Sequence, residues 1–213
     1  MRSKAVLFDL DGTFADTAAD LVRALNRVRA ARGMDALPLA ELRPYASAGA
    51  RGLIVAGLGI VPEQPEFKPV REEFLAYYAE AICVDTRLFP GVDALLDAVN
   101  ARGLRWGIVT NKSTSLTHKL LAEMRLDDRP DCVVCGDTTP HLKPHPASLL
   151  HAARELELAP QDCLYVGDDL RDVLAAHSAD MRSVAAAWGY GDGLANWNAD
   201  WIIAQPQDLI RLL

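Results

Sequence analysis

Short uninterrupted apolar runs along this chain alternate with longer segments whose apolar residues recur at helical spacing. Such runs are typical of buried strands in a parallel sheet that helices cover on both faces. Strands are expected over these ranges: 4–8, 104–109, 131–135, 163–166 and 182–186. Helices are expected between the later strands, beginning near Pro90, after Ser113, near Pro146 and after the fourth strand. The pattern predicts an α/β fold with a Rossmann-like, doubly wound parallel sheet.

Residues 15–85 lack this alternation, because all of their periodic segments are predicted to be helical. The first helix can begin at Asp16 or Thr17, and its apolar residues are Leu21, Val22, Leu25 and Val28. Further helices are expected from Pro38, over 48–58 and over 70–82. We therefore expect a core made of residues 1–14 and 86–213, with the helical segment 15–85 inserted after the first strand.

The bulk composition limits the partners of the chain. Its 213 residues, half of them hydrophobic, are enough for a large core with a smaller insertion. The net charge of −7 disfavours nucleic acid and anionic membranes, and the apolar run after Lys4 is too short to span a bilayer. An anionic substrate must therefore be attracted by local groups. Monomer and homodimer both stay open.

The four cysteines are Cys83, Cys132, Cys135 and Cys163. In a chain of this length they are not expected to form a disulfide framework. Cys132 and Cys135 have the spacing of a zinc or redox pair, but the valines between them predict a strand with two core cysteines. We therefore expect a reducing, cytoplasmic location.

Four polar segments follow or adjoin the predicted strands: Asp9–Thr13, Thr110–Asn111, Lys143–Pro144, and Gly167–Asp169 with Asp172. In doubly wound sheets, ligands bind at the carboxyl ends of the strands. If these ends converge, they bring several carboxylates, a hydroxyl and an ammonium group into one crevice. Such a set needs a cation to balance its negative charge, and it suits a substrate that carries phosphate. A magnesium-dependent phosphoryl-transfer site is the leading interpretation.

Asp9 and Asp11 lie two positions apart, so both side chains can point to one side of the strand end. A divalent cation would keep both carboxylates ionised, and a carboxylate can attack phosphorus to form an aspartyl phosphate. The alternative is a polar turn in which Gly12 supplies an unusual backbone dihedral. The other polar segments follow in the order expected of a single site, and this order favours the functional interpretation over the turn.

The other segments each allow a structural role beside a functional one. Thr110 and Asn111 can donate hydrogen bonds to phosphate or belong to a helix start. Lys143 precedes a proline, which favours a loop from which its ammonium reaches a phosphate, although a lone lysine is ordinarily a surface residue. Three acids follow the fourth strand: Asp168, Asp169 and Asp172. Helix capping explains one or two of them, and a role as metal ligand explains the remainder.

Together these segments resemble the motifs of the haloacid dehalogenase-like (HAD) superfamily, in its phosphoglycolate phosphatase-like branch. The segment 8–13 (Phe8-Asp9-Leu10-Asp11-Gly12-Thr13) matches the first motif, Thr110 the second, Lys143 the third, and Gly167-Asp168 with Asp172 the fourth. The match covers essentially the whole chain in the family's order. The resemblance implies a Mg²⁺-dependent phosphatase that acts on a small phosphorylated metabolite through an aspartyl phosphate.

The resemblance also implies roles for individual residues. Asp9 would be the nucleophile, and Asp11 the general acid that later serves as the base. Mg²⁺ would be held by Asp9, by Asp11 through its carbonyl and by Asp168, with Asp169 or Asp172 in support. Phosphate would be bound by Thr110, Asn111, Lys143 and Gly12.

The helical insertion resembles the family's mobile cap, which excludes water and contacts the leaving group. Ser47, Gly49 and Arg51 lie where such caps present substrate-contacting groups. Arg51 can pair with a substrate carboxylate or remain a surface arginine. Asp180 stands where relatives commonly have glycine, and aspartate tolerates a left-handed conformation better than most residues do.

Several activities stay open within this resemblance. The expected substrate is phosphoglycolate, the alternative is N-acetylmuramic acid 6-phosphate or another sugar phosphate, and a β-phosphoglucomutase-like phosphotransferase is a further alternative. Carbon–halogen hydrolysis needs neither a metal nor a second acid, so Asp11 and Asp168 argue against it. The helical insertion argues against a receiver-like phospho-aspartate switch. The presence of every proposed catalytic residue argues against an inactive interaction protein.

Overall fold

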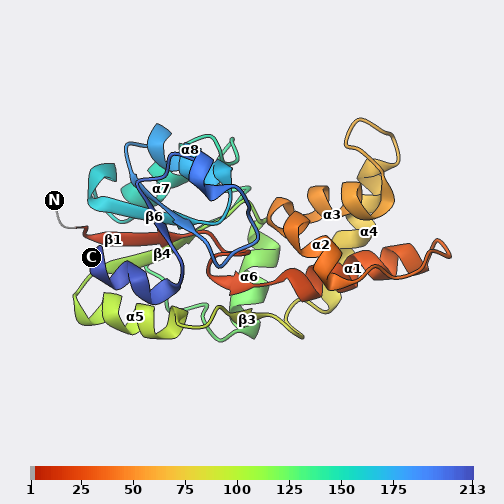
Figure 1. The fold of residues 1–213 in the computed structure, drawn as a ribbon, viewed down its shortest axis with the longest axis horizontal. Helices are drawn as coiled ribbons and strands as arrows, with labels where there is room; N and C mark the ends of the chain where they lie inside the picture. Colours follow the sequence, from red (N-terminus) through yellow and green to blue (C-terminus); the bar gives the residue numbers. More distant parts are fainter. Residues whose placement is uncertain (1–2) are drawn as a thin grey trace.

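A six-stranded parallel sheet forms the centre of the core (Figure 1). The computed structural model describes residues 3–213. The strands lie in the order β5-β4-β1-β6-β7-β8, and every neighbouring pair is parallel. Their bounds are Ala5–Phe8 (β1), Arg105–Val109 (β4), Cys132–Val134 (β5), Cys163–Gly167 (β6), Arg182–Ala186 (β7) and Trp201–Ile203 (β8). The carboxyl end of β1 is therefore flanked by those of β4 and β6.

Both faces of β1 are buried, because successive side chains of a strand point to opposite faces. The core helices are α5 (Val92–Ala101), α6 (Thr114–Glu123), α7 (Ala147–Glu155) and α8 (Leu170–Ser178). Val6 and Phe8 belong to an apolar cluster with α5 and α6, whereas Ala5 and Leu7 belong to a cluster with α7 and α8. Figure 1 shows α5 on one side of the sheet and α7 with α8 on the other. The predicted doubly wound α/β sheet is confirmed.

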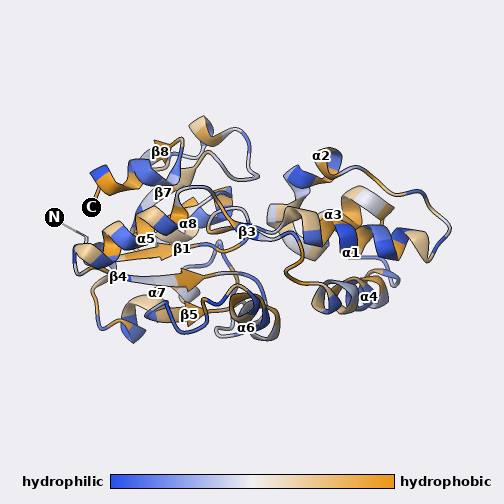
Figure 2. Cartoon of the chain, turned by 90° about the horizontal axis from the view of Figure 1, so that it is seen from below, coloured by the Kyte–Doolittle hydropathy of each residue, from blue (hydrophilic) through white to orange (hydrophobic). Residues whose placement is uncertain are grey.

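The helices between β2 and β3 form a second body, which we call the helical lobe. They are α1 (Ala18–Ala30), α2 (Leu39–Leu42), α3 (Gly49–Leu58) and α4 (Phe67–Glu80), with the 3₁₀ helix η1 (Arg43–Ala48). Figure 2 shows this lobe beyond the end of the sheet, with hydrophilic and hydrophobic residues alternating along α1. Leu25, Leu53 and Phe74 are among its buried apolar residues. The lobe therefore has an apolar interior of its own.

A two-stranded antiparallel sheet, which was not predicted, joins the lobe to the core. In it, β2 (Ala15–Asp16) pairs with β3 (Arg87–Leu88), so the outgoing and returning chain segments lie side by side. The expectation that residues 15–85 are wholly helical is therefore wrong at β2. A strand of two residues is too short to give the alternation of polar and apolar positions that identifies a strand.

The other predicted helices and strands occur within a few residues of their expected bounds. The helix expected from residue 70 begins at Phe67, because Pro69 is tolerated in the first turn of a helix. The strand β8 and the 3₁₀ helix η4 (Pro206–Arg211) were not predicted. Asp180 follows α8 with a φ of 56°, the left-handed conformation that aspartate tolerates.

Two features of the composition are clear in the fold. Cys132 and Cys135 are both free and buried, as expected of core cysteines. Within residues 3–213, none of the helices combines the length and the apolar character that crossing a bilayer requires.

Candidate active site

Three buried carboxylates meet where β1 and β6 end. Asp9 directly follows β1, Asp168 directly follows β6, and Asp172 lies in the first turn of α8. One carboxylate oxygen of each lies within 4.8 Å of the other two. The Asp9 amide continues the ladder between β1 and β6, donating to the Val166 carbonyl oxygen at 2.9 Å. The first and fourth sequence motifs therefore meet at one point, which we call the carboxylate cluster.

Burial makes the carboxylate cluster electrostatically unfavourable without a counterion. Burial raises the pKa of Asp9 to about 6, although the nearby charge of Lys143 opposes this rise. Burial, together with the charges of Asp9 and Asp172, holds the pKa of Asp168 well above its ordinary value. A divalent cation among these oxygens would favour their ionised forms. Carboxylate oxygens are ligands that Mg²⁺ prefers, so the cluster fits a Mg²⁺ site.

Lys143 links two members of the cluster. Its ammonium lies 2.8 Å from Asp9 Oδ1 and 2.7 Å from Asp172 Oδ1. It also donates to the Tyr165 hydroxyl at 2.7 Å. Burial would lower the pKa of Lys143, but its two carboxylate partners outweigh burial and raise it. The ammonium therefore stays charged and offsets part of the negative charge of the cluster.

The segment after β4 supports the loop that carries Lys143. The Asn111 side-chain amide donates to the Lys143 carbonyl oxygen at 3.1 Å and accepts from the Lys143 amide at 2.9 Å. Asn111 was predicted to donate to phosphate through its side chain or its backbone N–H, and here the side chain positions this loop. Thr110 is buried, and its hydroxyl oxygen accepts from the Lys112 amide at 3.1 Å. The hydroxyl proton of Thr110 is thus available to a ligand.

Asp11 lies apart from the carboxylate cluster and has a cation of its own. Thr17 Oγ1 donates to Asp11 Oδ1 at 2.6 Å, and the Lys112 ammonium contacts both carboxylate oxygens at 2.8 and 2.9 Å. The Lys112 side chain is 7% exposed, and its ammonium lies 4.7 Å from the centre of the Tyr78 ring. Thr17 is the N-cap of α1, yet its side chain makes no capping hydrogen bond, because its hydroxyl is engaged with Asp11.

Asp168 is held by groups from distant parts of the chain. Thr13 Oγ1 donates to it at 2.8 Å, and the Tyr190 amide donates at 2.9 Å. Gly12 has a φ of 89°, in the left-handed region that favours glycine. A Cβ atom at Gly12 would clash with the Asp168 carboxylate and the Tyr190 ring. Glycine is therefore required here both by the backbone conformation and by the space beside Asp168.

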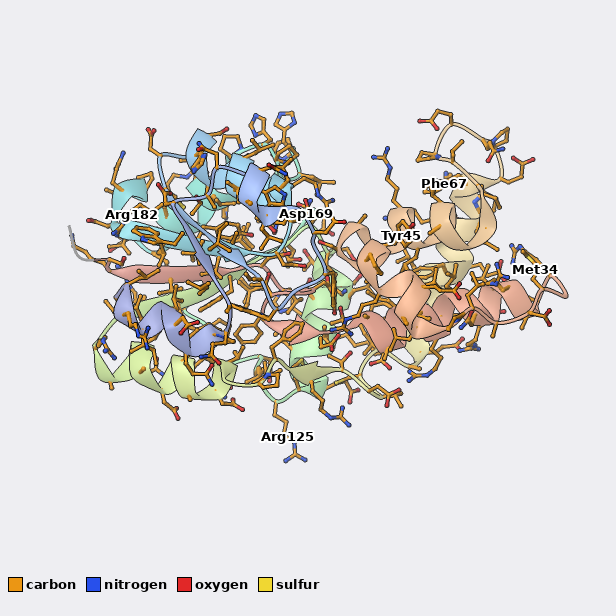
Figure 3. The ribbon with its side chains drawn as sticks, in the orientation of Figure 1. Met34, Tyr45, Phe67, Arg125, Asp169 and Arg182 are labelled. Carbon is orange, nitrogen blue, oxygen red and sulfur yellow. The ribbon has the colours of Figure 1, made fainter. Side chains whose placement is uncertain are left out.

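Asp169 and Asp172 have different surroundings although both cap α8. In their capping box, the Asp169 side chain accepts from the Arg171 amide. The Asp169 carboxylate also accepts from the Ser47 hydroxyl at 3.2 Å, and Arg171 donates to the Ser47 carbonyl oxygen at 3.0 Å. Figure 3 shows Asp169 on the part of the core that faces the lobe. Asp172 belongs to the carboxylate cluster, whereas Asp169 belongs to the contact between core and lobe.

A cavity of about 500 Å³ lies between the core and the helical lobe. From the core, its lining residues include Asp9, Asp11, Thr110, Asn111 and Lys143. From the lobe, they include Ser47, Gly49, Arg51, Arg71 and Tyr78. The cavity therefore brings residues expected to act in catalysis and residues expected to contact substrate to one space.

The cavity wall offers groups for covalent phosphoryl transfer. It presents a carboxylate at Asp9, a separately held carboxylate at Asp11 and the ammonium of Lys143. These are, in kind, a nucleophile, an acid–base group and an anion stabiliser. Sequence analysis missed Lys112, although it directly follows Asn111. It also missed Tyr165 and Tyr190, for which the chain gives no local signal, because they act through contacts between distant segments.

Three comparisons bear on this chain. Residues 6–186 match the family model of haloacid dehalogenase-like hydrolases. N-acetylmuramic acid 6-phosphate phosphatase of Pseudomonas aeruginosa is 38% identical over 216 aligned positions, which cover 100% of this chain and 96% of that protein. Phosphoglycolate phosphatase of Xanthomonas campestris pv. campestris is 39% identical over 209 positions, which cover 97% of this chain and 94% of that protein.

Solved structures have the same fold. A predicted phosphoglycolate phosphatase from Haemophilus somnus 129PT superposes with a TM-score of 0.87 and 29% identity, covering 99% of this chain and 98% of that chain. CbbY from Rhodobacter sphaeroides in complex with phosphate superposes with a TM-score of 0.75 and 26% identity, covering 97% of this chain and 96% of that chain.

Proposed function

This chain belongs to the haloacid dehalogenase-like hydrolase family, and we propose that it is a Mg²⁺-dependent phosphomonoesterase. The observation that carries the proposal is the buried cluster of Asp9, Asp168 and Asp172, in which Asp9 and Asp172 line the cavity. Three buried carboxylates need a cation, and the Lys143 ammonium between two of them supplies only one positive charge.

The nucleophile in this proposal is Asp9. Lys143 contacts Oδ1 of Asp9, which leaves Oδ2 as the attacking oxygen. This oxygen forms a bond to the phosphorus of the substrate while the bond between phosphorus and the leaving oxygen breaks. Asp11, which takes up a proton before this step, gives that proton to the leaving oxygen and becomes ionised. The product of this half-reaction is a phosphoryl group on Asp9 and a free alcohol.

The second half-reaction releases phosphate. Asp11, now ionised, removes a proton from a water molecule that attacks the phosphorus, and the bond between phosphorus and Asp9 breaks. The Lys112 ammonium and the Thr17 hydroxyl orient the Asp11 carboxylate for this role. Inorganic phosphate leaves, and Asp9 regains its carboxylate.

Mg²⁺ would be held by the carboxylates of Asp9 and Asp168 and by the carbonyl of Asp11, with Asp172 in support. When bound, it supplies positive charge that stabilises the transferring phosphoryl group. Thr110 and Lys143 would bind the phosphoryl oxygens, with backbone N–H groups near Gly12 and Asn111. Electrostatic stabilisation by such preorganised groups is ordinarily the largest part of catalysis.

The substrate would be a small phosphorylated metabolite that enters the cavity between core and lobe. The two relatives act on phosphoglycolate and on N-acetylmuramic acid 6-phosphate, and both compounds are phosphate esters of an acid. We propose residues 15–85 as a cap over a core of residues 1–14 and 86–213. Free cysteines fit a reducing cytoplasm, where we place the activity.

The test uses purified protein with p-nitrophenyl phosphate. Hydrolysis should require Mg²⁺, stop in EDTA and return when excess Mg²⁺ is added. Asp9→Asn should lower kcat by about 10⁴-fold or more while the circular dichroism spectrum stays unchanged. Asp162→Asn is the matched control. Asp162 precedes β6 and pairs with Lys4, which precedes β1, so both residues lie at the amino ends of the strands, away from the carboxylate cluster. Full activity of Asp9→Asn would contradict the proposal.

A further inference from the structure

Two arginines of the helical lobe line the cavity without an anionic partner. Arg51 lies on α3 and Arg71 on α4, and both side chains are exposed toward solvent and cavity. Within residues 3–213, neither guanidinium makes an ion pair, whereas the following arginines of the lobe do: Arg23, Arg27, Arg32 and Arg43. Lys68 of α4 is also unpaired, but it does not line the cavity, so Arg51 and Arg71 are the unpaired cations of the lobe at the cavity wall within the described residues.

These two cations are not needed for the phosphoryl group. Lys143 lies at the carboxylate cluster, on the core side, together with the proposed Mg²⁺ site. Arg51 and Arg71 come from the opposite wall. The net charge of −7 gives no general attraction for anions, so an anionic leaving group must be attracted by local cations such as these. The leaving group is the part of the substrate that would extend from the phosphoryl site toward the lobe.

Apart from the two arginines, Ser47 and Tyr78, the lobe wall of the cavity is apolar. It includes Pro62, Phe67, Phe74 and Leu75. The cavity volume is about 500 Å³. One water molecule takes roughly 30 Å³ in the liquid, so the roughly nine non-hydrogen atoms of phosphoglycolate need at most about 270 Å³. A leaving group larger than glycolate, with apolar surface beside its charge, fits the remaining space.

Resting on the proposed function, we infer that Arg51 and Arg71 form one subsite that binds a carboxylate of the leaving group. The planar guanidinium presents a fork of N–H donors that matches a carboxylate, and two such groups on different helices restrict where it lies. The enzyme therefore selects phosphate esters of sugar acids over their neutral counterparts. The sequence around Arg71 contains no ligand-binding motif, so its place in this subsite is inferred from its position at the cavity wall.

The experiment compares esters that carry the acid with esters that lack it. One pair is N-acetylmuramic acid 6-phosphate with N-acetylglucosamine 6-phosphate, which lacks the whole lactyl ether and, with it, the carboxylate. The second pair is 2-phosphoglycolate with ethyl phosphate. The wild-type protein should prefer the acid of the first pair by about tenfold or more in kcat/KM. Arg71→Ala and Arg51→Ala should each lower kcat/KM for that acid by about 10- to 100-fold and change the neutral ester by less than about twofold.

Two further variants separate the subsite from a general charge effect. Lys68→Ala removes one positive charge from the same helix as Arg71, but Lys68 does not line the cavity, so it should leave the preference unchanged. Arg71→Lys keeps the charge without the fork and should recover part of the loss. Equal losses on acid and neutral esters, or a wild-type protein with no preference, would overturn the inference while leaving the phosphatase proposal intact. Absence of Mg²⁺-dependent hydrolysis of every ester would instead overturn the proposed function and, with it, the subsite.

Discussion

The ammonium of Lys143 lies 2.8 Å from Oδ1 of Asp9. Lys143 comes from a loop far along the chain from Asp9, and the pair is buried at the end of β1. The contact opposes the effect of burial on the Asp9 carboxylate, whose pKa is nevertheless raised to about 6. Asp9 is therefore a carboxylate whose ionisation depends on its cationic neighbours.

Replacing Lys143 should impair turnover and make the activity more sensitive to acid. Lys143→Met removes a cation from Asp9 and Asp172, so the pKa of Asp9 should rise. Loss of such an electrostatic group ordinarily costs about 10²–10³-fold in kcat. The pH–rate profile at saturating Mg²⁺ should also have its acidic limb displaced to higher pH. A profile unchanged in position would contradict the proposed influence of Lys143 on Asp9.

Binding of Mg²⁺ should weaken as the pH falls. The pKa of Asp9 is raised to about 6 and that of Asp168 is raised well above its ordinary value, so protons compete with the metal for these oxygens. Below about pH 6, the Mg²⁺ affinity measured by calorimetry should fall by about tenfold or more per pH unit. Calorimetry in buffers of different ionisation enthalpy should detect proton release on binding near pH 6. A Mg²⁺ affinity that does not change between about pH 5 and about pH 7 would contradict this account.

Lys112 should matter for the acid–base step. Lys112→Met leaves the Asp11 carboxylate with the Thr17 hydroxyl but without its cation. We expect kcat to fall by about 10- to 100-fold, a fraction of what positioned acid–base catalysis supplies. Lys4→Met is the control, because Lys4 pairs with Asp162 beside the opposite end of the sheet. Turnover at the wild-type rate in Lys112→Met would show that the contact with Asp11 has no catalytic role.

Asp20 should stabilise the connection between core and lobe. This buried residue of α1 accepts hydrogen bonds from the backbone of Val84, Asp85 and Thr86 and from the Thr86 hydroxyl. Asp20→Asn should lower the free energy of unfolding by about 2–4 kcal/mol, because several donors lose a charged acceptor. Asp97→Asn, at an exposed position of α5, should change it little.

The Asp20 contribution should also depend on pH. Burial would raise the pKa of Asp20, but hydrogen bonds from Thr86, Arg23 and the backbone outweigh burial and lower it. A carboxyl group with a depressed pKa contributes stability above its unfolded pKa of about 4 and loses this contribution as the pH falls through its folded pKa. The difference in melting temperature between wild type and Asp20→Asn should therefore shrink below about pH 4. A difference that grows in acid would contradict this assignment.

The sequence was sufficient to predict which polar segments come together, because the carboxyl ends of parallel strands lie at the same end of the sheet. Asp9 and Asp168 follow long apolar runs, so their positions could be inferred without tertiary information. The strands β2 and β8 could not, because two or three residues carry too little periodicity.

The partners of the motif residues were beyond sequence reasoning. Tyr190 contacts Asp168 through its amide and Asp16 through its hydroxyl, from a loop with no motif of its own. The side chains of Asn111 and Ser47 make contacts that the surrounding sequence does not indicate. Asn111 bonds to the backbone of Lys143, and Ser47 bonds to Asp169. Such contacts depend on loop conformations that local composition leaves open.

Identification of the phosphorylated residue tests the central claim most directly. Rapid quenching of the enzyme with a radiolabelled phosphate ester, followed by peptide mapping, reports where the phosphoryl group resides during turnover. We predict acid-stable, hydroxylamine-sensitive label on the peptide that contains Asp9, and none in Asp9→Asn. Label on a different residue, or rapid hydrolysis in which the protein never becomes labelled, would contradict a mechanism through Asp9.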